Sequence, residues 1–326
     1  MLSRLSPAVA TESHRMHVTL LSRGEAIHST HRLVEAARTL GHRVRVLDPL
    51  SLQMGLGKGV PLLLAGEKPP PRTDVVIPRF GQSIHTYGLA LVNQYDLAGV
   101  PALNDATSIA QARNKMRLMQ LLLRSGLPVP PTVMGRGADE LGRMVEHVGG
   151  LPVALKILEG PERSGVLICE SAQSMEATLD AVLAMGHNIV VQRYVEPGEG
   201  RDLRALVVGG KLVAAVRRHP APGRLRHTLG AGKRVTPVRL AKAQAHLAIE
   251  ATRVVGLEVA AVDLVELDGS TRVFDVHPSP GLRDLEAAAG EDLAVPIIQR
   301  AVEIARQRRA RPLPPSAARS RRPPAT

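Results

Sequence analysis

Charged side chains interrupt several segments of this sequence that are otherwise apolar. Lys156 lies within the apolar run 153–158, and Asp263 and Asp275 interrupt two later apolar stretches. Burying a lone charge is very costly, so each group must be paired or must face a cleft. Asp275 and His277 lie two residues apart in a predicted strand and therefore point to the same face. Paired carboxylate oxygens are the ligands that Mg²⁺ prefers when it is held on a triphosphate.

Each of these signals has a structural alternative. A lysine on an edge strand can extend its ammonium group to water, and two acids on a sheet edge can be matched by arginines. Arg204 and Arg217 also interrupt apolar strands, where a guanidinium group suits phosphate or carboxylate recognition or an internal ion pair. Segments 55–59 and 230–233 contain a Gly-Lys pair but lack the spacing of a P-loop.

The hydrophobic pattern predicts the elements that position these residues. Segments 17–22, 43–47 and 74–78 are typical of buried strands, and an amphipathic helix is predicted over residues 29–40. Gly41 would end that helix. Strands and helices that alternate at this spacing indicate a parallel α/β unit.

A second group of elements follows this unit. A strong amphipathic helix is predicted over residues 108–125. Two late strands are expected to form a hairpin that turns at Asp268 and Gly269, which would place Asp263 and Asp275 on adjacent strands. The other predictions are a loop or hairpin over 55–71, strands over 151–158, 188–192, 203–208, 211–217, 259–267 and 272–276, and helices over 241–255 and 295–306.

The composition restricts the class of protein. The 326 residues are 44% hydrophobic, which is enough for two or three domains or lobes. Three Tyr and two Phe are the only aromatic residues, which argues against a reader of single-stranded nucleic acid. Cys169 is the only cysteine, so neither an internal disulfide nor a cysteine metal cluster can form. No apolar run approaches the ~20 residues of a membrane span, and we expect a cytoplasmic protein without membrane contact.

The formal net charge of +12 is concentrated at the C-terminus. Residues 306–326 contain seven arginines, five prolines and no acid, which predicts a disordered Arg/Pro-rich tail. Such a tail could contact RNA, a ribosome or an acidic protein, or could only improve solubility. Residues 1–15 lack the apolar stretch of a signal peptide and are expected to be a disordered leader.

Seven blocks of residues share their order and spacing with one known family. They are residues 21–23, 47–51, 76–79, 114–120, 156–160, 202–209 and 279–282. Together they resemble the RimK-type ATP-grasp ligases, the family of the ribosomal-protein α-L-glutamate ligase. The resemblance runs from about His17 to Ala305. It implies an α/β protein with an ATP-grasp fold and an N-terminal parallel α/β (pre-ATP-grasp) domain.

The resemblance also implies a domain order and an activity. We expect the pre-ATP-grasp domain over 16–105, the ATP-grasp small lobe over 106–192 and the C-terminal lobe over 193–305. The family implies that ATP converts a carboxylate to an acylphosphate and that an amine then attacks to form an amide. Glutamate would be the incoming amino acid, and the acceptor a protein, peptide or small-molecule carboxylate. Such an enzyme mainly positions reactants and neutralises charge. RimK-type proteins are often tetramers, which implies a homotetramer.

Site residues follow from the same resemblance. Lys115 and Lys156 would hold the ATP phosphates, Arg204 would face the acylphosphate, and Asp202 would contact the ribose. Lys156 and Arg204 are the expected catalytic residues. The remaining nucleotide contacts are expected from Arg193, Tyr194 and Val195 in a hinge beside the adenine, and from Arg226, His227 and Thr228 in a nucleotide or substrate loop. The expected ligands of Mg²⁺ or Mn²⁺ are Asp263, Asp275 and His277.

Four regions depart from the family pattern. The family has Glu at Arg193, Ser and Asn at His227 and Thr228, a glycine-richer loop at residues 161–164, and Glu-x-Asn at Asp275-Val276-His277. Asp275 remains a hard oxygen ligand, whereas the nitrogen of His277 suits Zn²⁺ or Mn²⁺ better than Mg²⁺. The sequence therefore leaves two functions open, an active ATP-dependent ligase and an inactive ATP-grasp scaffold that binds a nucleotide or a protein.

Overall fold

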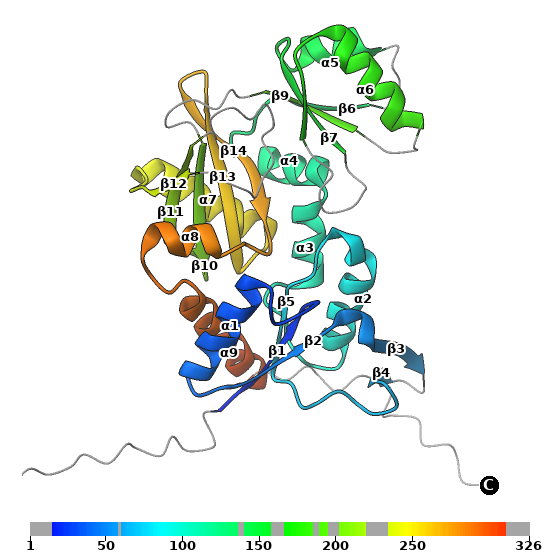
Figure 1. The fold of residues 1–326 in the computed structure, drawn as a ribbon, viewed down its shortest axis with the longest axis vertical. Coiled ribbons are helices and arrows are strands. Elements are labelled where there is room, and N and C mark those ends of the chain that lie inside the picture. The colour runs from blue at the N-terminus through cyan, green and yellow to red at the C-terminus, as the bar shows by residue number, and fades with distance from the viewer. Residues whose placement is uncertain are drawn as a thin grey trace, which may run out of the picture.

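The computed structural model describes most of the chain, with gaps at both ends and in several loops. Its elements form three bodies that follow one another along the long axis of the molecule (Figure 1): an N-terminal α/β domain, a five-stranded sheet, and a smaller lobe. None of the described helices is long and apolar enough to cross a membrane. The described residues are 15–57, 60–135, 140–157, 166–184, 189–194, 202–219 and 234–310.

The N-terminal domain is built on a parallel sheet with strand order β2-β1-β5, as the alternating strands and helices predict. Neighbouring residues of β1 face opposite layers, because Leu20 packs with α1 and α9 whereas Leu21 packs with α2. The segment predicted as a loop or hairpin is the hairpin β3-β4. The bounds are β1 His17–Leu21, α1 His28–Thr39, β2 Arg43–Leu47, η2 Pro49–Ser51, β3 Leu52–Gly57, β4 Val60–Ala65, β5 Val75–Pro78, η3 Gln82–Ile84, α2 His85–Leu97 and α9 Ala294–Ala310.

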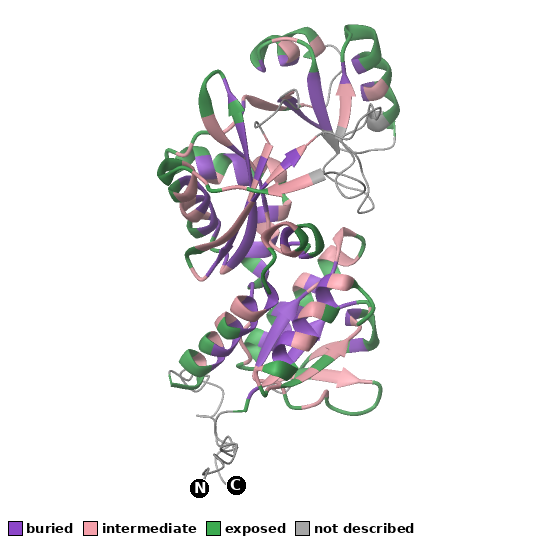
Figure 2. Ribbon diagram, turned by 60° about the vertical axis from the view of Figure 1, so that its left-hand side comes forward, coloured by how far each residue is buried: buried purple, intermediate pink, exposed green. Residues whose placement is uncertain are grey.

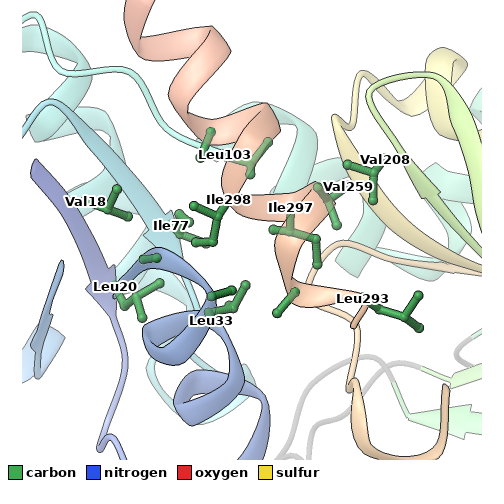
Figure 3. Packing of buried hydrophobic residues seen from close by; sticks show 14 of the residues in the cluster. Val18, Leu20, Leu33, Ile77, Leu103, Val208, Val259, Leu293, Ile297 and Ile298 are labelled. Atoms are coloured by element: carbon green, nitrogen blue, oxygen red, sulfur yellow. The ribbon is translucent and has the colours of Figure 1, made fainter. Parts of the chain in front are cut away.

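The N-terminal domain and the central sheet share one hydrophobic core (Figure 3). Leu20 and Ile77 of the first sheet lie in the same buried cluster as Ile298 of α9 and as Val208 and Val259 of the central sheet. Buried residues therefore continue from one sheet to the next (Figure 2). Because separating the two bodies would expose this apolar surface to water, the shared core holds them in a defined relative position.

The central sheet is antiparallel, with strand order β12-β11-β10-β13-β14. Helices α3, α4 and α7 cover one face, and α8 and α9 pack against the other. The predicted turn between β13 and β14 is confirmed, since Asp268 and Gly269 both have positive φ, at 51° and 71°. The bounds are α3 Ala106–Arg113, α4 Lys115–Arg124, β10 Asp202–Val208, β11 Lys211–His219, β12 Arg234–Pro237, α7 Lys242–Val255, β13 Val259–Leu267, β14 Ser270–His277 and α8 Arg283–Ala289.

The small lobe is a second antiparallel sheet, with strand order β6-β9-β7-β8. Side chains of α5 and α6, such as Met144 and Leu179, pack with Leu155 of β7 in a hydrophobic cluster of this lobe alone. The lobe thus has its own hydrophobic core. The bounds are β6 Thr132–Gly135, α5 Leu141–His147, β7 Val153–Ile157, β8 Val166–Cys169, α6 Ala172–Ala184 and β9 Ile189–Arg193.

The single helix predicted over residues 108–125 is wrong, because the structure has two helices there. Helix α3 ends at Arg113 and α4 begins at Lys115. Asn114 lies between them, and its side-chain oxygen accepts a hydrogen bond from the backbone N–H of Arg117 at 3.0 Å. Asparagine favours this N-cap position because its side chain satisfies a free N–H of the first turn. The break makes Lys115 the first residue of a new helix.

The disordered tail predicted from residue 306 is also corrected, because α9 extends to Ala310. The helix continues since acids of the N-terminal domain pair with its last turn, Arg308 with Asp96 and Arg309 with Asp74. The remainder of the predicted tail, residues 311–326, lies outside the described residues, as does segment 1–14 of the predicted leader.

Asn104, just before α3, binds the two ends of the β13-β14 hairpin. Its amide group donates to the carbonyl oxygens of Val259 and Pro278, both at 2.8 Å. Its carbonyl oxygen accepts the N–H groups of Glu258 and Val259 at 2.7 Å and 3.0 Å. Both donors and both acceptor positions of this buried side chain are therefore used. The start of β13 and the loop after β14 are held by one residue.

Replacing Asn104 with alanine is expected to lower the free energy of unfolding by about 3 kcal/mol, because several buried backbone groups lose their partner at once. Urea denaturation followed by circular dichroism measures this change. Asn93→Ala in α2 is the matched control, since Asn93 is exposed and its replacement should change stability by less than about 0.5 kcal/mol. Equal stability of the two variants would contradict the role given to Asn104.

Candidate active site

One face of the central sheet carries a row of charged residues on three adjacent strands. Arg204 of β10 lies opposite Asp263 of β13, and Asp263 lies opposite Asp275 of β14. The Nε and Nη2 atoms of Arg204 bind the two carboxylate oxygens of Asp263 at 2.7 Å and 2.8 Å. Asp263 is only 2% exposed, so this bidentate pair is a buried and geometrically fixed contact.

Arg218 of β11 extends the row to a fourth strand. Its Nη1 atom lies 3.1 Å from Oδ2 of Asp263, and its Nε atom binds Oδ1 of Asp202 at 2.8 Å. The sequence singled out Arg217 in this strand, but Arg217 lies opposite Leu203 and therefore on the other face of the sheet. Arg218 shares the face of Arg204 because Arg204 lies opposite Val216, two residues before Arg218. This register comes from the structure, and the sequence alone carried no signal for it.

Lys115 and His277 complete the cluster. The Nζ atom of Lys115, the first residue of α4, binds Oδ1 of Asp275 at 2.5 Å. His277 Nε2 lies 3.1 Å from Oδ2 of Asp263 and 3.7 Å from Oδ2 of Asp275. The expectation that Asp275 and His277 share a face is therefore confirmed. Lys115, which is distant from both in sequence, reaches them only because Asn114 starts a helix at this point.

The electrostatics of the cluster favour charged groups at neutral pH. Burial alone would raise the pKa of Asp263, but Arg204, Arg218 and His277 together hold it well below its ordinary value. Burial would lower the pKa of Arg204, but its interactions with Asp263 and the neighbouring acids raise it instead. The two groups thus keep each other ionised, which turns a costly burial of charge into a stable pair.

The expected hinge residues Arg193 and Tyr194 lie at the end of β9. The guanidinium group of Arg193 binds both carboxylate oxygens of Asp268 at 3.0 Å and 3.3 Å, and its backbone N–H donates to Pro131 at 3.1 Å. Asp268 forms the β13-β14 turn, so this pair links the small lobe to the central sheet. Arg193, which stands where the family has glutamate, thus forms a contact between the lobes. Contact of Arg193 and Tyr194 with adenine stays a prediction.

For several of the expected site residues, the structure describes only the backbone or does not describe the residue at all. Lys156 is paired in β7 with Val166 and Val190 through its backbone, and nothing is described of its side chain. Asp202 is described, and its carboxylate binds Arg218, while its contact with ribose stays a prediction. Four residues lie outside the described parts of the chain: Val195, Arg226, His227 and Thr228.

The predicted metal ligands are together, but their oxygens are bound to cationic side chains. Asp263 binds Arg204 and Asp275 binds Lys115, and in the described parts of the chain no group of three His, Cys, Asp or Glu residues is arranged to hold a metal ion. The donor types still suit a divalent cation, since His277 Nε2 lies 3.1 Å and 3.7 Å from a carboxylate oxygen of each of the two acids. Metal binding by Asp263, Asp275 and His277 therefore stays a prediction.

Comparisons with known proteins agree with this fold. A model of the RimK-like ATP-grasp domain matches residues 112–301, and a model of the RimK pre-ATP-grasp domain matches residues 16–109. A probable α-L-glutamate ligase of Marinomonas sp. (strain MWYL1) is 38% identical over 284 residues, which cover 87% of this chain and 94% of that protein. A probable α-L-glutamate ligase of Pseudomonas aeruginosa (strain UCBPP-PA14) matches with the same identity and coverage.

Solved structures show the same fold at lower identity. The ATP-grasp ligase PsnB with its minimal precursor has a TM-score of 0.68 at 19% identity and covers 90% of this chain and 99% of that chain. A RimK domain ATP-grasp protein from Sphaerobacter thermophilus has a TM-score of 0.68 at 21% identity, covering 88% of this chain and 99% of that one. With both halves of the fold matched and relatives at 38% identity over most of its length, the chain belongs to the RimK family of ATP-grasp ligases.

Proposed function

We propose that this protein is an ATP-dependent carboxylate–amine ligase that adds glutamate to a protein or peptide carboxylate through an acylphosphate. The buried pair of Arg204 with Asp263 is the observation that carries the proposal, because it holds a cation rigidly on the sheet face beside Lys115 and Asp275. The names of the relatives, probable α-L-glutamate ligases, support glutamate as the amino acid.

Arg204 has a geometry that suits stabilisation of an acylphosphate. Two of its three guanidinium nitrogens bind Asp263, so the plane of the group is set before any substrate binds. A fixed cation neutralises charge that develops on the reacting phosphoryl group without having to reorganise. Lys115 carries the second positive charge, and it would exchange its partner Asp275 for a phosphate oxygen when a nucleotide is bound. A bound divalent cation would supply further charge neutralisation on the phosphates.

The experiment that tests this function combines the purified protein with ATP, Mg²⁺, glutamate and a panel of peptides that end in a free carboxylate. ADP release that depends on both glutamate and a peptide, with a product heavier by one or more glutamate residues, is the expected result. An inactive ATP-grasp scaffold is the alternative that the departures from the family favour. Calorimetric binding of ATP without ADP release for any amino acid would support the scaffold and overturn the ligase.

His277 is expected to decide which metal supports activity. We expect His277→Asn to raise the ratio of Mg²⁺- to Mn²⁺-supported ADP release by about 10-fold, because an amide oxygen suits Mg²⁺ better than an imidazole nitrogen. Calorimetry of ADP binding in each metal checks the same change without turnover. His219→Asn is the control, since His219 lies on β11 and binds Thr236 rather than the carboxylates. An unchanged metal ratio in His277→Asn would remove His277 from the metal site.

Three further proposals concern the surroundings of the enzyme. Use of ATP fits a cytoplasmic location, and the family resemblance supports a homotetramer, which sedimentation velocity would test. Contact of the basic C-terminal segment with RNA or a ribosome is supported only by its charge. Removal of residues 311–326 should abolish a salt-sensitive association with RNA if that contact exists, and unchanged association would exclude it.

A further inference from the structure

Arg79 is a cation without a carboxylate partner in the described part of the chain. It follows β5 directly, and its Nη2 atom donates one hydrogen bond, to the carbonyl oxygen of Pro280 at 2.9 Å. No described Asp or Glu lies within ion-pair distance of it. Burial lowers the pKa of Arg79 to about 10, which leaves the group charged at neutral pH. The residue as a whole is nevertheless only partly buried.

The position of Arg79 relates it to the charged cluster. Strand β5 is parallel to its neighbour, and ligands of open parallel sheets bind at the carboxyl ends of the strands, where Arg79 lies. Pro280, its hydrogen-bond partner, is three residues beyond His277 at the end of β14. Asn104 holds the intervening loop through the carbonyl oxygen of Pro278. Arg79 therefore extends from the N-terminal domain towards the end of the strand that carries Asp275 and His277.

The backbone next to Arg79 is held in place by Arg113 of α3. Arg113 donates to the carbonyl oxygens of Phe80 and Gly81, and its guanidinium carbon lies 5.1 Å from the centre of the Phe80 ring. That ring packs against Gly88 so closely that a Cβ atom there would lie 2.3 Å from it. These contacts fix the start of the loop, so Arg79 is presented by a rigid support rather than by a loose chain.

Among the described side chains of the charged cluster, the other cations are already matched by acids. Arg204 and Arg218 bind Asp263, and Lys115 binds Asp275. A ligase that joins a carboxylate to an amino acid must hold two substrate carboxylates, the one that is activated and the α-carboxylate of the amino acid. The first belongs beside the phosphate-binding cations of the sheet face. The second requires a separate cation at the edge of the same site, and Arg79 meets that requirement.

We propose that Arg79 binds the α-carboxylate of the incoming amino acid and thereby sets the position of its amine. The inference rests on the proposed ligase function. The amine and the α-carboxylate are joined to the same carbon, so a guanidinium that grips the carboxylate also orients the nucleophile. Arginine suits this role because its planar fork matches a carboxylate with two parallel hydrogen bonds, which lysine cannot form.

The test compares Arg79→Gln and Arg79→Lys with wild type in steady-state ADP release. We expect Arg79→Gln to raise the KM for glutamate by roughly 10- to 100-fold, with the KM for ATP unchanged, because a charge-assisted contact is lost. Arg79→Lys should give a smaller rise. Arg43→Gln is the matched control, since Arg43 is an exposed arginine on β2 of the same domain and its loss should leave both constants unchanged.

Two glutamate analogues separate the two carboxylates of the amino acid. Glutamine keeps the α-carboxylate and loses the side-chain carboxylate, whereas the α-amide of glutamate does the reverse. Wild type should be sensitive to loss of the α-carboxylate, and Arg79→Gln should no longer distinguish glutamate from its α-amide. If Arg79→Gln instead loses its discrimination against glutamine, Arg79 binds the side-chain carboxylate and the proposal is overturned.

Measurement of glutamate binding at equilibrium tests the role of Arg79 separately from the proposed ligase function, because it does not require turnover. If wild type binds ATP but releases no ADP, the ligase function fails, and calorimetric titration of glutamate in the presence of ADP and Mg²⁺ still tests Arg79. Weaker glutamate binding by Arg79→Gln, with the melting temperature of wild type, supports the proposal. Equal binding by the two proteins, or no binding of glutamate by wild type, overturns it. Arg79→Lys covers the case in which Arg79→Gln does not fold, since lysine can still donate to Pro280.

Discussion

Replacing Asp263 with asparagine is expected to reduce ADP release by at least about 1,000-fold, a loss of about 4 kcal/mol in transition-state stabilisation. The amide cannot hold Arg204 through two charge-assisted bonds, so the cation proposed to face the acylphosphate loses its fixed position. Asp263 is also the buried partner of Arg218. Initial rates at saturating ATP measure the effect on turnover.

The same substitution is expected to destabilise the fold by about 3–5 kcal/mol, because it leaves two arginines beside a neutral group in a buried site. Urea denaturation measures this loss. Glu266→Gln is the matched control, because Glu266 lies on the same strand but is exposed, and it should change neither rate nor stability noticeably. An Asp263→Asn protein with wild-type turnover would show that the buried pair is not part of the catalytic machinery.

Acid should remove the contribution of Asp263 to stability in wild type. Since its folded-state pKa lies well below the ordinary value, this contribution is complete above the unfolded pKa of about 3.9 and is lost as pH falls towards the folded pKa. Stability measured below about pH 4 should therefore fall more steeply in wild type than in Asp263→Asn. Parallel curves for the two proteins would contradict the depressed pKa.

The second large effect is expected for Arg204→Lys, which keeps the positive charge but loses the guanidinium fork. We expect kcat to fall by about 100-fold with little change in the KM for ATP, because a single ammonium cannot bind both oxygens of Asp263 and present a fixed cation at the same time. Coupled measurement of ADP release over a range of ATP concentrations separates the two constants.

Arg217→Lys is the control for this substitution, because Arg217 lies on the next strand but on the opposite face of the sheet. Its kcat should stay within about 3-fold of wild type. If Arg204→Lys and Arg217→Lys reduce kcat equally, the effect arises from disturbance of the sheet, and Arg204 loses its assigned role.

The sequence alone determined the family and most of the strands, although it did not predict β6, β8 or β12. Alternation of apolar and polar residues is a local property, and the Asp268-Gly269 turn is a local signal, so the pairing of Asp263 with Asp275 followed from the residues. The local pattern was misleading where an N-cap residue lies inside a continuous helical pattern of apolar residues. The apolar pattern over residues 108–125 hid the break at Asn114, although asparagine is a common N-cap.

Only the tertiary structure decided which charges meet. Lys115 and Asp275 are far apart in the chain, and Arg218 rather than Arg217 faces Asp263 because the register of β10 with β11 sets the face of each residue. That register depends on packing of the whole sheet, which no short segment encodes. The same holds for Arg79, whose lack of an acidic partner among the described residues appears only when the N-terminal domain is placed against the loop after β14.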